Sequence, residues 1–428
     1  MEHKKTSLES IDDGNEDNKQ PKIYAKNSMN RFGDDMYGLI LSYLSLEDRF
    51  QLECVSKQFQ RTVFGSVVFI DITDQFDGES KTCFTAIIEM LAKKCPNIET
   101  IDFRGMIIEC EEHIPEVLRL FRDNCLNLRE VYCNLVENTA QMYRQFGPLV
   151  TQIDCNKLSD TVVDTTSGHQ LANNLKTFKC NHYNTEDKQL FTAFVAHNQC
   201  LKSLNIVDIY DLNDTLPELA VQLSRLTQLR ELTLGLVFDV LNVLDDKMQT
   251  SAAVNQCLRT IGVNCKQLNR LSLELISVET EPAFQISLDS LRVYRQLKRL
   301  RITADEVIDD RLLDPLRHCK RLTHLELCLW RMKANVLKDL HIKCPRLQYL
   351  FIRDFNSIID AECLSHLSRL PALQTLVIDG KDCGDDSKVC GEESNYLSDN
   401  DLNAVLSSSP KLKTIEIRVN NGKKFYYK

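Results

Sequence analysis

Residues 297–302 read Leu-Lys-Arg-Leu-Arg-Ile, residues 322–327 read Leu-Thr-His-Leu-Glu-Leu, and residues 347–352 read Leu-Gln-Tyr-Leu-Phe-Ile. In each stretch the first, fourth and sixth residues are apolar. The same pattern occurs thirteen times between Val67 and Ile417, and successive copies begin 22 to 39 residues apart. A phrase that recurs at this interval predicts a solenoid, in which each copy is one structural unit stacked on its neighbours.

The phrase has the spacing of the leucine-rich-repeat signature. Its second and third apolar positions are two residues apart, so both side chains face the same side of a strand. Several copies are followed or preceded by apolar residues at helical spacing, as in Leu216, Leu219, Leu223 and Leu226. The sequence therefore predicts an α/β leucine-rich-repeat horseshoe with parallel strands on the concave face and helices outside. The middle anchors of the thirteen copies are Ile70, Ile101, Val131, Ile153, Phe178, Leu204, Leu232, Leu271, Leu300, Leu325, Leu350, Leu376 and Ile415.

The composition fits one long repeat array. The chain has 428 residues, of which 43% are hydrophobic, and its formal net charge is −9. This negative charge argues against general binding to nucleic acid or to an anionic membrane. The sequence contains no apolar run of signal-peptide type and none long enough to span a bilayer. We therefore expect a soluble protein of the cytoplasm, the nucleus or both.

Many of the seventeen cysteines occupy equivalent positions of successive repeats. Cys95, Cys125, Cys265, Cys319 and Cys344 each lie three residues before the first anchor of a copy, where a small buried apolar group is needed. No Cys-x-x-Cys pair occurs and the count is odd, so reduced structural thiols are favoured over a disulfide framework.

The chain divides into four parts. Residues 1–30 are charged and poor in large apolar groups, which predicts a disordered tail. Residues 31–64 have helical spacing without the repeat phrase, and residues 65–419 hold the array. Residues 420–428 lack a further copy, so this tail either caps the end of the array or folds back along its concave face. A Gly-, Asp-, Ser- and Glu-rich insert at residues 379–396 is expected to be an exposed acidic loop.

Residues 31–64 predict three short helices. Asp34 or Asp35 can cap the first, and Ser45 followed by Asp48 matches a capping box that opens the second. Three helices of about ten residues bury too little surface to be stable alone. A partner or the first repeat is therefore expected to complete their core.

The segments Leu41–Asp48 and Cys54–Phe59 resemble the F-box, with Phe32-Gly33 where the family usually has Leu-Pro. Cys-Pro-Asn-Ile at residues 95–98 and Cys-Pro-Arg-Leu at residues 344–347 resemble the repeat subtype that commonly follows F-boxes. The resemblance implies docking onto a Skp-type adaptor, and through it onto a cullin, in an SCF-type ubiquitin ligase. It places the following residues against the adaptor or in the core of the module: Phe32, Met36, Leu39, Ile40, Leu44, Leu46, Phe50 and Val55.

Alternate strand residues project from the concave face, which we expect to bind an unidentified protein substrate. The early face is rich in acidic residues, such as Asp102 and Asp154. The late repeats combine basic with aromatic residues, a composition typical of binding hot spots and of sites for carboxylate or phosphate groups. The candidate substrate-binding residues are Arg299, Arg301, His324, Tyr349, Phe351 and Arg353.

No motif for catalysis, a cofactor or a metal is found. His318, Cys319, His324 and Cys328 have the right residue types for a metal site, but the repeat register separates Cys319 from His324 by a core layer. The lack of such motifs favours a non-catalytic protein, and the resemblance to the F-box implies the substrate receptor of a ubiquitin-protein ligase. A repeat scaffold that assembles proteins without ubiquitin transfer is the alternative.

Overall fold

The structure is a computed structural model of the 428-residue chain. It describes residues 34–51, 54, 57–72, 81–103, 114–135, 150–158, 175–238, 246–277, 287–307, 311–331, 334–354, 359, 361–380, 398–419 and 422–428. The expected tail at residues 1–30 and most of the acidic insert at residues 379–396 lie outside these ranges.

The described residues form one fourteen-stranded sheet in which spatial order equals sequence order. Neighbouring strands are parallel from β1 to β13, as the repeat predicts. Only the last pair, β13 and β14, is antiparallel. The strands are β1 (Phe69–Asp71), β2 (Thr100–Asp102), β3 (Glu130–Leu135), β4 (Val150–Lys157), β5 (Thr177–His182), β6 (Ser203–Ile209), β7 (Glu231–Phe238), β8 (Arg270–Ser277), β9 (Arg299–Val307), β10 (His324–Arg331), β11 (Tyr349–Asp354), β12 (Thr375–Gly380), β13 (Thr414–Val419) and β14 (Gly422–Tyr427).

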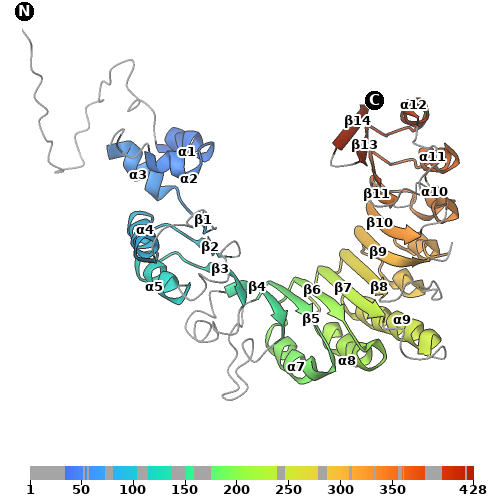
Figure 1. The fold of residues 1–428 in the computed structure, drawn as a ribbon, viewed down its shortest axis with the longest axis horizontal. Coiled ribbons are helices and arrows are strands. Elements are labelled where there is room, and N and C mark those ends of the chain that lie inside the picture. The colour runs from blue at the N-terminus through green and yellow to red at the C-terminus, as the bar shows by residue number, and fades with distance from the viewer. Residues whose placement is uncertain are drawn as a thin grey trace, which may run out of the picture.

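Helices cover the outer side of this sheet, so that the solenoid curves into an arch with strands inside (Figure 1). The α-helices of the solenoid are α4 (Lys81–Lys94), α5 (Ile114–Asn124), α7 (Lys188–His197), α8 (Leu212–Ser224), α9 (Asp246–Asn264), α10 (Leu340–Lys343), α11 (Ala361–Ser368) and α12 (Asp399–Ser408). Short 3-10 helices are η6 (Thr185–Asp187), η7 (Asp289–Val293), η8 (Asp314–His318) and η9 (Ala334–Leu337). The described outer segments between β8 and β11 are thus tighter and shorter than α8 or α9. No described helix is long and apolar enough to cross a membrane.

The thirteen predicted repeats coincide with β1 to β13, and the fold class is confirmed. Middle anchors pair with middle anchors, as in Leu300 with Leu325 and Leu325 with Leu350. One junction departs from this rule: Ile153 of β4 pairs with Cys133 of β3, two residues beyond the middle anchor Val131. The shift follows the shortest spacing in the array, 22 residues, and because it equals two residues it leaves the inward and outward faces unchanged.

The anchors and the inner faces of the helices form one continuous core along the arch. Leu216, Leu219, Leu223 and Leu226 are at most 1% exposed, as their helical spacing predicts. Wherever the structure describes it, the residue three positions before a first anchor is also buried. Cys265 occupies this slot in one repeat, where its thiol donates to the carbonyl oxygens of Leu223 and Leu226 at 3.3 and 3.4 Å. Through its thiol, Cys265 therefore contacts the preceding turn of the solenoid.

Burial keeps these thiols protonated. It raises the pKa of Cys265 to about 12. The pKa of Cys95 is also raised to about 12, mainly by burial and to a smaller extent by the nearby thiol of Cys125. A thiol with such a pKa is neither a nucleophile nor a ready metal ligand at neutral pH. The cysteines whose side chains the structure describes form no disulfide with one another.

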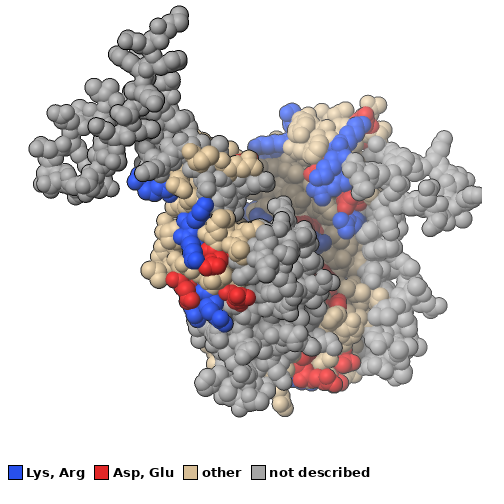
Figure 2. Space-filling model, turned by 60° about the vertical axis from the view of Figure 1, so that its left-hand side comes forward, with Lys and Arg blue, Asp and Glu red and all other residues tan. Residues whose placement is uncertain are grey.

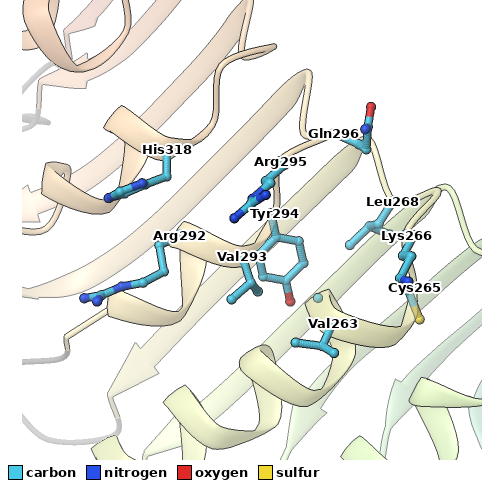
Figure 3. Close-up of a pocket in the computed structure, with 11 residues that line it drawn as sticks. Val263, Cys265, Lys266, Leu268, Arg292, Val293, Tyr294, Arg295, Gln296 and His318 are labelled. Carbon is cyan, nitrogen blue, oxygen red and sulfur yellow. The ribbon is translucent and has the colours of Figure 1, made fainter.

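Tyr294 fills the same slot before β9 with a much larger side chain. It is 3% exposed, and its hydroxyl donates to the carbonyl oxygen of Leu258 at 2.7 Å. The ring fits because α9 has a glycine at the contact: a Cβ at Gly262 would lie 2.9 Å from two atoms of the Tyr294 ring and would also meet Val293. Figure 3 shows the ring of Tyr294 next to this helix, on the wall of an open cavity.

The C-terminal tail caps the array. Strand β14 pairs along the whole of β13, with Ile417 opposite Lys424 and Ile415 opposite Tyr426. Tyr426 packs against the core, and its hydroxyl donates to Asp399 Oδ1 at 2.6 Å, while Lys424 Nζ contacts the same carboxylate at 2.7 Å. The sequence left the choice between a cap and a return along the concave face open; the structure has the cap.

Gly262→Ala should destabilise the protein, although alanine is the better helix former by about 1 kcal/mol. The added methyl group would overpack the contact with Tyr294, for which we expect a net loss of about 1–2 kcal/mol. Gly38→Ala is the matched control, since a Cβ at Gly38 meets nothing within 4 Å. This variant should gain up to about 1 kcal/mol. Denaturant unfolding measures the change in unfolding free energy of each variant. Changes of the same sign would contradict the account of Gly262.

Candidate protein-interaction sites

The N-terminal module consists of three helices, α1 (Asp34–Ser42), α2 (Leu46–Gln51) and α3 (Lys57–Gly65). The predicted cap at the start of α2 is present. The backbone N–H of Asp48 donates to Ser45 Oγ at 3.1 Å, and the Ser45 hydroxyl donates to the Asp48 carboxylate at 2.7 Å. Tyr43 and Leu44 follow the end of α1, in the turn that leads to α2.

This module shares its core with the first repeats, as its small size predicts. Leu41 and Val63 are both 0% exposed and belong to the same cluster as the solenoid anchors. Asn97, in the turn before β2, donates its side-chain amide to the carbonyl oxygen of Gly65 at 3.0 Å. Lys94 Nζ lies 4.9 Å from the ring centre of Phe64. The contact fixes the module against one end of the arch (Figure 1).

An apolar stripe along α1 and the first residue of the turn after it faces away from this core. Met36, Leu39, Ile40 and Tyr43 have helical i, i+3, i+4, i+7 spacing, and their exposed fractions are 46%, 53%, 37% and 82%. A helix normally directs such a stripe into a core, so an exposed one indicates a surface for a partner. We call these four residues the α1 stripe. Tyr43 is its most exposed member and was missing from the predicted docking residues; its place three residues after Ile40 is the signal that could have found it.

The other predicted docking residues lie elsewhere. Leu44 is partly buried and packs against the common core. Leu46 and Phe50 belong to α2, but their side chains are outside the description, as are Phe32 and Val55 altogether. The structure thus brings Met36, Leu39 and Ile40 together on one exposed surface.

The concave face carries the predicted substrate-binding residues in rows across the sheet. Arg299, His324 and Tyr349 are neighbours in register on β9, β10 and β11. The rings of His324 and Tyr349 stack with centres 5.5 Å apart and planes 26° apart. In the next row Arg301 pairs with Glu326, Nη1 to Oε2, at 3.5 Å. Four of the six predicted residues, Arg299, Arg301, His324 and Tyr349, therefore form one contiguous and partly exposed surface.

The expectation that Phe351 is exposed on this face is wrong. Its ring is 7% exposed and packs with Cys328 and Val377 in a small second cluster on the concave side of the sheet. The guanidinium carbons of Arg353 and Arg418 lie 5.8 and 5.5 Å from its ring centre. Neighbours supplied by other repeats cover the ring, so the alternation within β11 alone could not predict its burial. Asp102, expected on the early face, is also buried, at 6% exposure, between Asp71 and Tyr132 of the adjacent strands.

Most charges of the late concave face are paired between repeats. Arg353 Nε contacts Asp379 Oδ2 at 2.8 Å, and Arg270 Nη1 contacts Glu231 Oε1 at 2.7 Å. In Figure 2 basic and acidic side chains lie next to each other on the arm at the upper right, which carries the C-terminal repeats. Arg299 makes no ion pair with any described residue and is available for a partner.

Among the described residues no group of three or more His, Cys, Asp or Glu could hold a metal ion. The structure also separates the four residues weighed in the sequence. Cys319 is buried in its pre-strand slot, whereas His324 and Cys328 face the concave side of β10.

The N-terminal module is similar to a known domain family. Residues 30–70 match the model of the F-box domain. An F-box domain therefore begins the described part of this chain. The match covers α1, α2, α3 and β1, a span slightly wider than the predicted residues 31–64. No curated protein matches the sequence.

Solved structures resemble the chain at low identity. An internalin (inlF) from Listeria monocytogenes is 13% identical with a TM-score of 0.40, over 90% of this chain and 89% of that chain. A chain of the yeast Rad7 and Elc1 complex is 14% identical with a TM-score of 0.45, over 85% and 92%. The leucine-rich-repeat-containing protein LegL7 from Legionella pneumophila is 14% identical with a TM-score of 0.38, over 71% and 97%.

His324 should make stability depend on pH. The pKa of His324 is lowered below its ordinary value, mainly by burial and also by the positive charge of Arg299. The unfolded chain therefore takes up a proton at this site before the folded protein does, and unfolding free energy is lost as the pH falls below about 6.5. His324→Phe, which keeps a ring against Tyr349, should lose less unfolding free energy than the wild type between neutral pH and about pH 5.

Chemical denaturation across this pH range measures the effect. His197→Phe, at an exposed histidine on α7, is the control for replacement of a histidine as such. If His324→Phe and the wild type show the same pH dependence, the titration of His324 does not contribute.

Proposed function

We propose that this protein is the substrate-recognition subunit of an SCF-type ubiquitin-protein ligase. The F-box match at residues 30–70 is the observation that carries the proposal. In this function the F-box binds a Skp-type adaptor, the adaptor connects it to a cullin, and the repeats bind the protein that is to be ubiquitinated. Such a receptor acts where the ligase acts, in the cytoplasm, the nucleus or both.

The α1 stripe supports the adaptor contact. Its apolar side chains are exposed although the module already has a core, formed by Leu41 and Val63 together with the first repeats. Burial of apolar surface gains about 25 cal/mol per Å², so the four large exposed side chains of the α1 stripe supply a substantial driving force for association. Because the module packs firmly on the solenoid, adaptor and substrate would be held in a fixed relation.

The late concave face supports substrate binding. The guanidinium group of Arg299 makes no ion pair with a described residue, and His324 with Tyr349 offers a stacked pair of rings beside it. A guanidinium next to aromatic surface suits a peptide that carries a carboxylate or a phosphate beside an apolar residue. The chain itself would contribute no chemistry: holding the substrate near a ubiquitin-conjugating enzyme raises the local concentration of the reacting groups.

The double substitution Met36→Asp and Leu39→Asp should abolish adaptor binding without unfolding the protein. Both side chains are about half exposed, and a charged group there would have to be desolvated in the complex. Val221→Asp, at a residue that is 52% exposed on α8, is the matched control. A pull-down with the Skp-type adaptor, with circular dichroism as a test of folding, measures the effect. Undiminished adaptor binding by a folded double variant would contradict the proposal and favour a scaffold without ubiquitin transfer.

Substrate capture should depend on the late concave face. Arg299→Glu with Tyr349→Ser should remove most substrate binding. Adaptor binding should stay unchanged, because the α1 stripe and the late concave face lie on opposite arms of the arch (Figure 1). Loss of a charge-assisted contact and an aromatic contact costs about 2–4 kcal/mol in a binding hot spot. Proximity labelling with and without proteasome inhibition, compared between wild type and variant, identifies the captured proteins. An unchanged set would exclude this surface.

A further inference from the structure

The turns that lead into β8 to β11 lie side by side along one edge of the solenoid. Backbone hydrogen bonds align them: the N–H of Lys298 donates to the carbonyl oxygen of Asn269 at 2.8 Å, and the N–H of Thr323 donates to that of Lys298 at 2.9 Å. The next turn continues the series, since the N–H of Gln348 donates to the carbonyl oxygen of Thr323 at 2.8 Å. Adjacent parallel strands are about 4.8 Å apart, so equivalent residues of these turns form closely spaced rows.

These rows are basic although the chain as a whole has a net charge of −9. Seven lysine and arginine residues are exposed in or directly beside the four turns: Lys266, Arg295, Lys298, Arg317, Lys320, Arg321 and Arg346. We call them the basic edge. The arrangement follows from the repeat, because a basic residue recurs one or two positions before the first anchor, as in Lys266 before Leu268 and Arg295 before Leu297.

The basic edge is not neutralised by the protein. None of its seven side chains makes an ion pair with any residue that the structure describes. Among the described residues, Asp289 is already paired with Arg292 at 2.7 Å and Asp314 with Lys343 at 2.8 Å. The concave face differs, since Arg270, Arg301 and Arg353 there each have a carboxylate partner. Basic side chains are stabilising near the C-terminus of a helix, which accounts for Arg317 in the last turn of η8. The other six residues lie in the turns that follow the helices.

A cavity of about 580 Å³ opens at this edge, between the end of α9 and η7. Its apolar wall includes Val263, Val293 and Tyr294, and its basic wall includes Lys266, Arg295 and His318. In Figure 3 the side chains of Arg292, Arg295 and His318 extend to the same side, and Lys266 lies across the ring of Tyr294 from them. A cavity of this size admits an amino-acid side chain with a phosphate group.

We propose that the basic edge is a second binding site, which takes an acidic, phosphorylated segment of a partner protein. The phosphate enters the cavity beside Arg295 and Lys266, and acidic residues that flank it contact Lys320, Arg321 and Arg346. Charge-assisted contacts of guanidinium and ammonium groups with phosphate are about twice as strong as neutral hydrogen bonds. The site lies outside the concave face and does not depend on the proposed function.

Two observations favour a peptide over a nucleic acid. Proteins that bind single strands combine basic grooves with exposed aromatic side chains on which bases stack. The described residues at this edge expose Val263 and Ile342 as their large apolar side chains, while exposed aromatic residues such as Tyr210 and Phe425 lie elsewhere. The strongly negative net charge would in addition repel a long polyanion that extends beyond the edge.

The test compares two triple variants of the full-length protein. The edge variant carries Lys266→Gln, Arg295→Gln and Lys320→Gln. The control variant carries Arg119→Gln, Arg259→Gln and Lys338→Gln, which removes three exposed positive charges from outer segments. The probe is a fluorescent peptide with one phosphoserine between glutamates; its unphosphorylated form and a short oligouridine RNA are the comparison ligands. Fluorescence anisotropy at physiological ionic strength gives the dissociation constants, and circular dichroism verifies folding.

We expect the wild type to bind the phosphopeptide more tightly than either comparison ligand. The edge variant should bind it about tenfold more weakly or worse, and the control variant should change affinity less than about threefold. Three results would overturn the proposal: no binding by the wild type, the same loss in both variants, or tighter binding of the RNA. Adaptor binding should be equal in all three proteins, so failure here leaves the proposed function untouched.

Discussion

Every repeat of this protein depends on its neighbours for burial. A single strand with its outer helix has one apolar face, and only the next turn of the solenoid can cover it. The residues three positions before the first anchors show the contact most directly, because the thiol of Cys265 and the hydroxyl of Tyr294 both donate to carbonyl oxygens of the preceding turn. The F-box joins the same chain of contacts through Leu41 and Val63. The hydrophobic core is therefore long and narrow and runs continuously along the repeats.

This dependence explains what the sequence could predict. The strands were predictable because each one needs apolar residues at fixed positions, and the short helix α2 was predictable because Ser45 and Asp48 make its cap within four residues. The exposed positions on α1 could likewise be found by helical spacing. All these features are local in the chain, so the information that determines them lies within one repeat or one helix.

Features that arise between repeats were not predictable in the same way. The burial of Phe351 depends on Val377, Arg353 and Arg418, which come from three different strands. The register shift between β3 and β4 depends on how two repeats stack, and the unusual spacing of 22 residues was its only trace in the sequence. The pairing of concave arginines with carboxylates on the next strand has the same origin. Candidate binding residues on a repeat surface thus need the inter-strand register before their exposure can be judged.

Strand β14 has a consequence for how an array of this kind can change in length. Each parallel strand offers the next repeat the same pattern of backbone groups, so an internal duplication could insert a unit at many junctions. The reversed direction of β14, held by Tyr426 and Lys424 at Asp399, ends that equivalence. A new unit added after it would meet an edge of the wrong polarity. A duplicated repeat can therefore keep parallel neighbours on both sides only if it is inserted before the hairpin of β13 and β14.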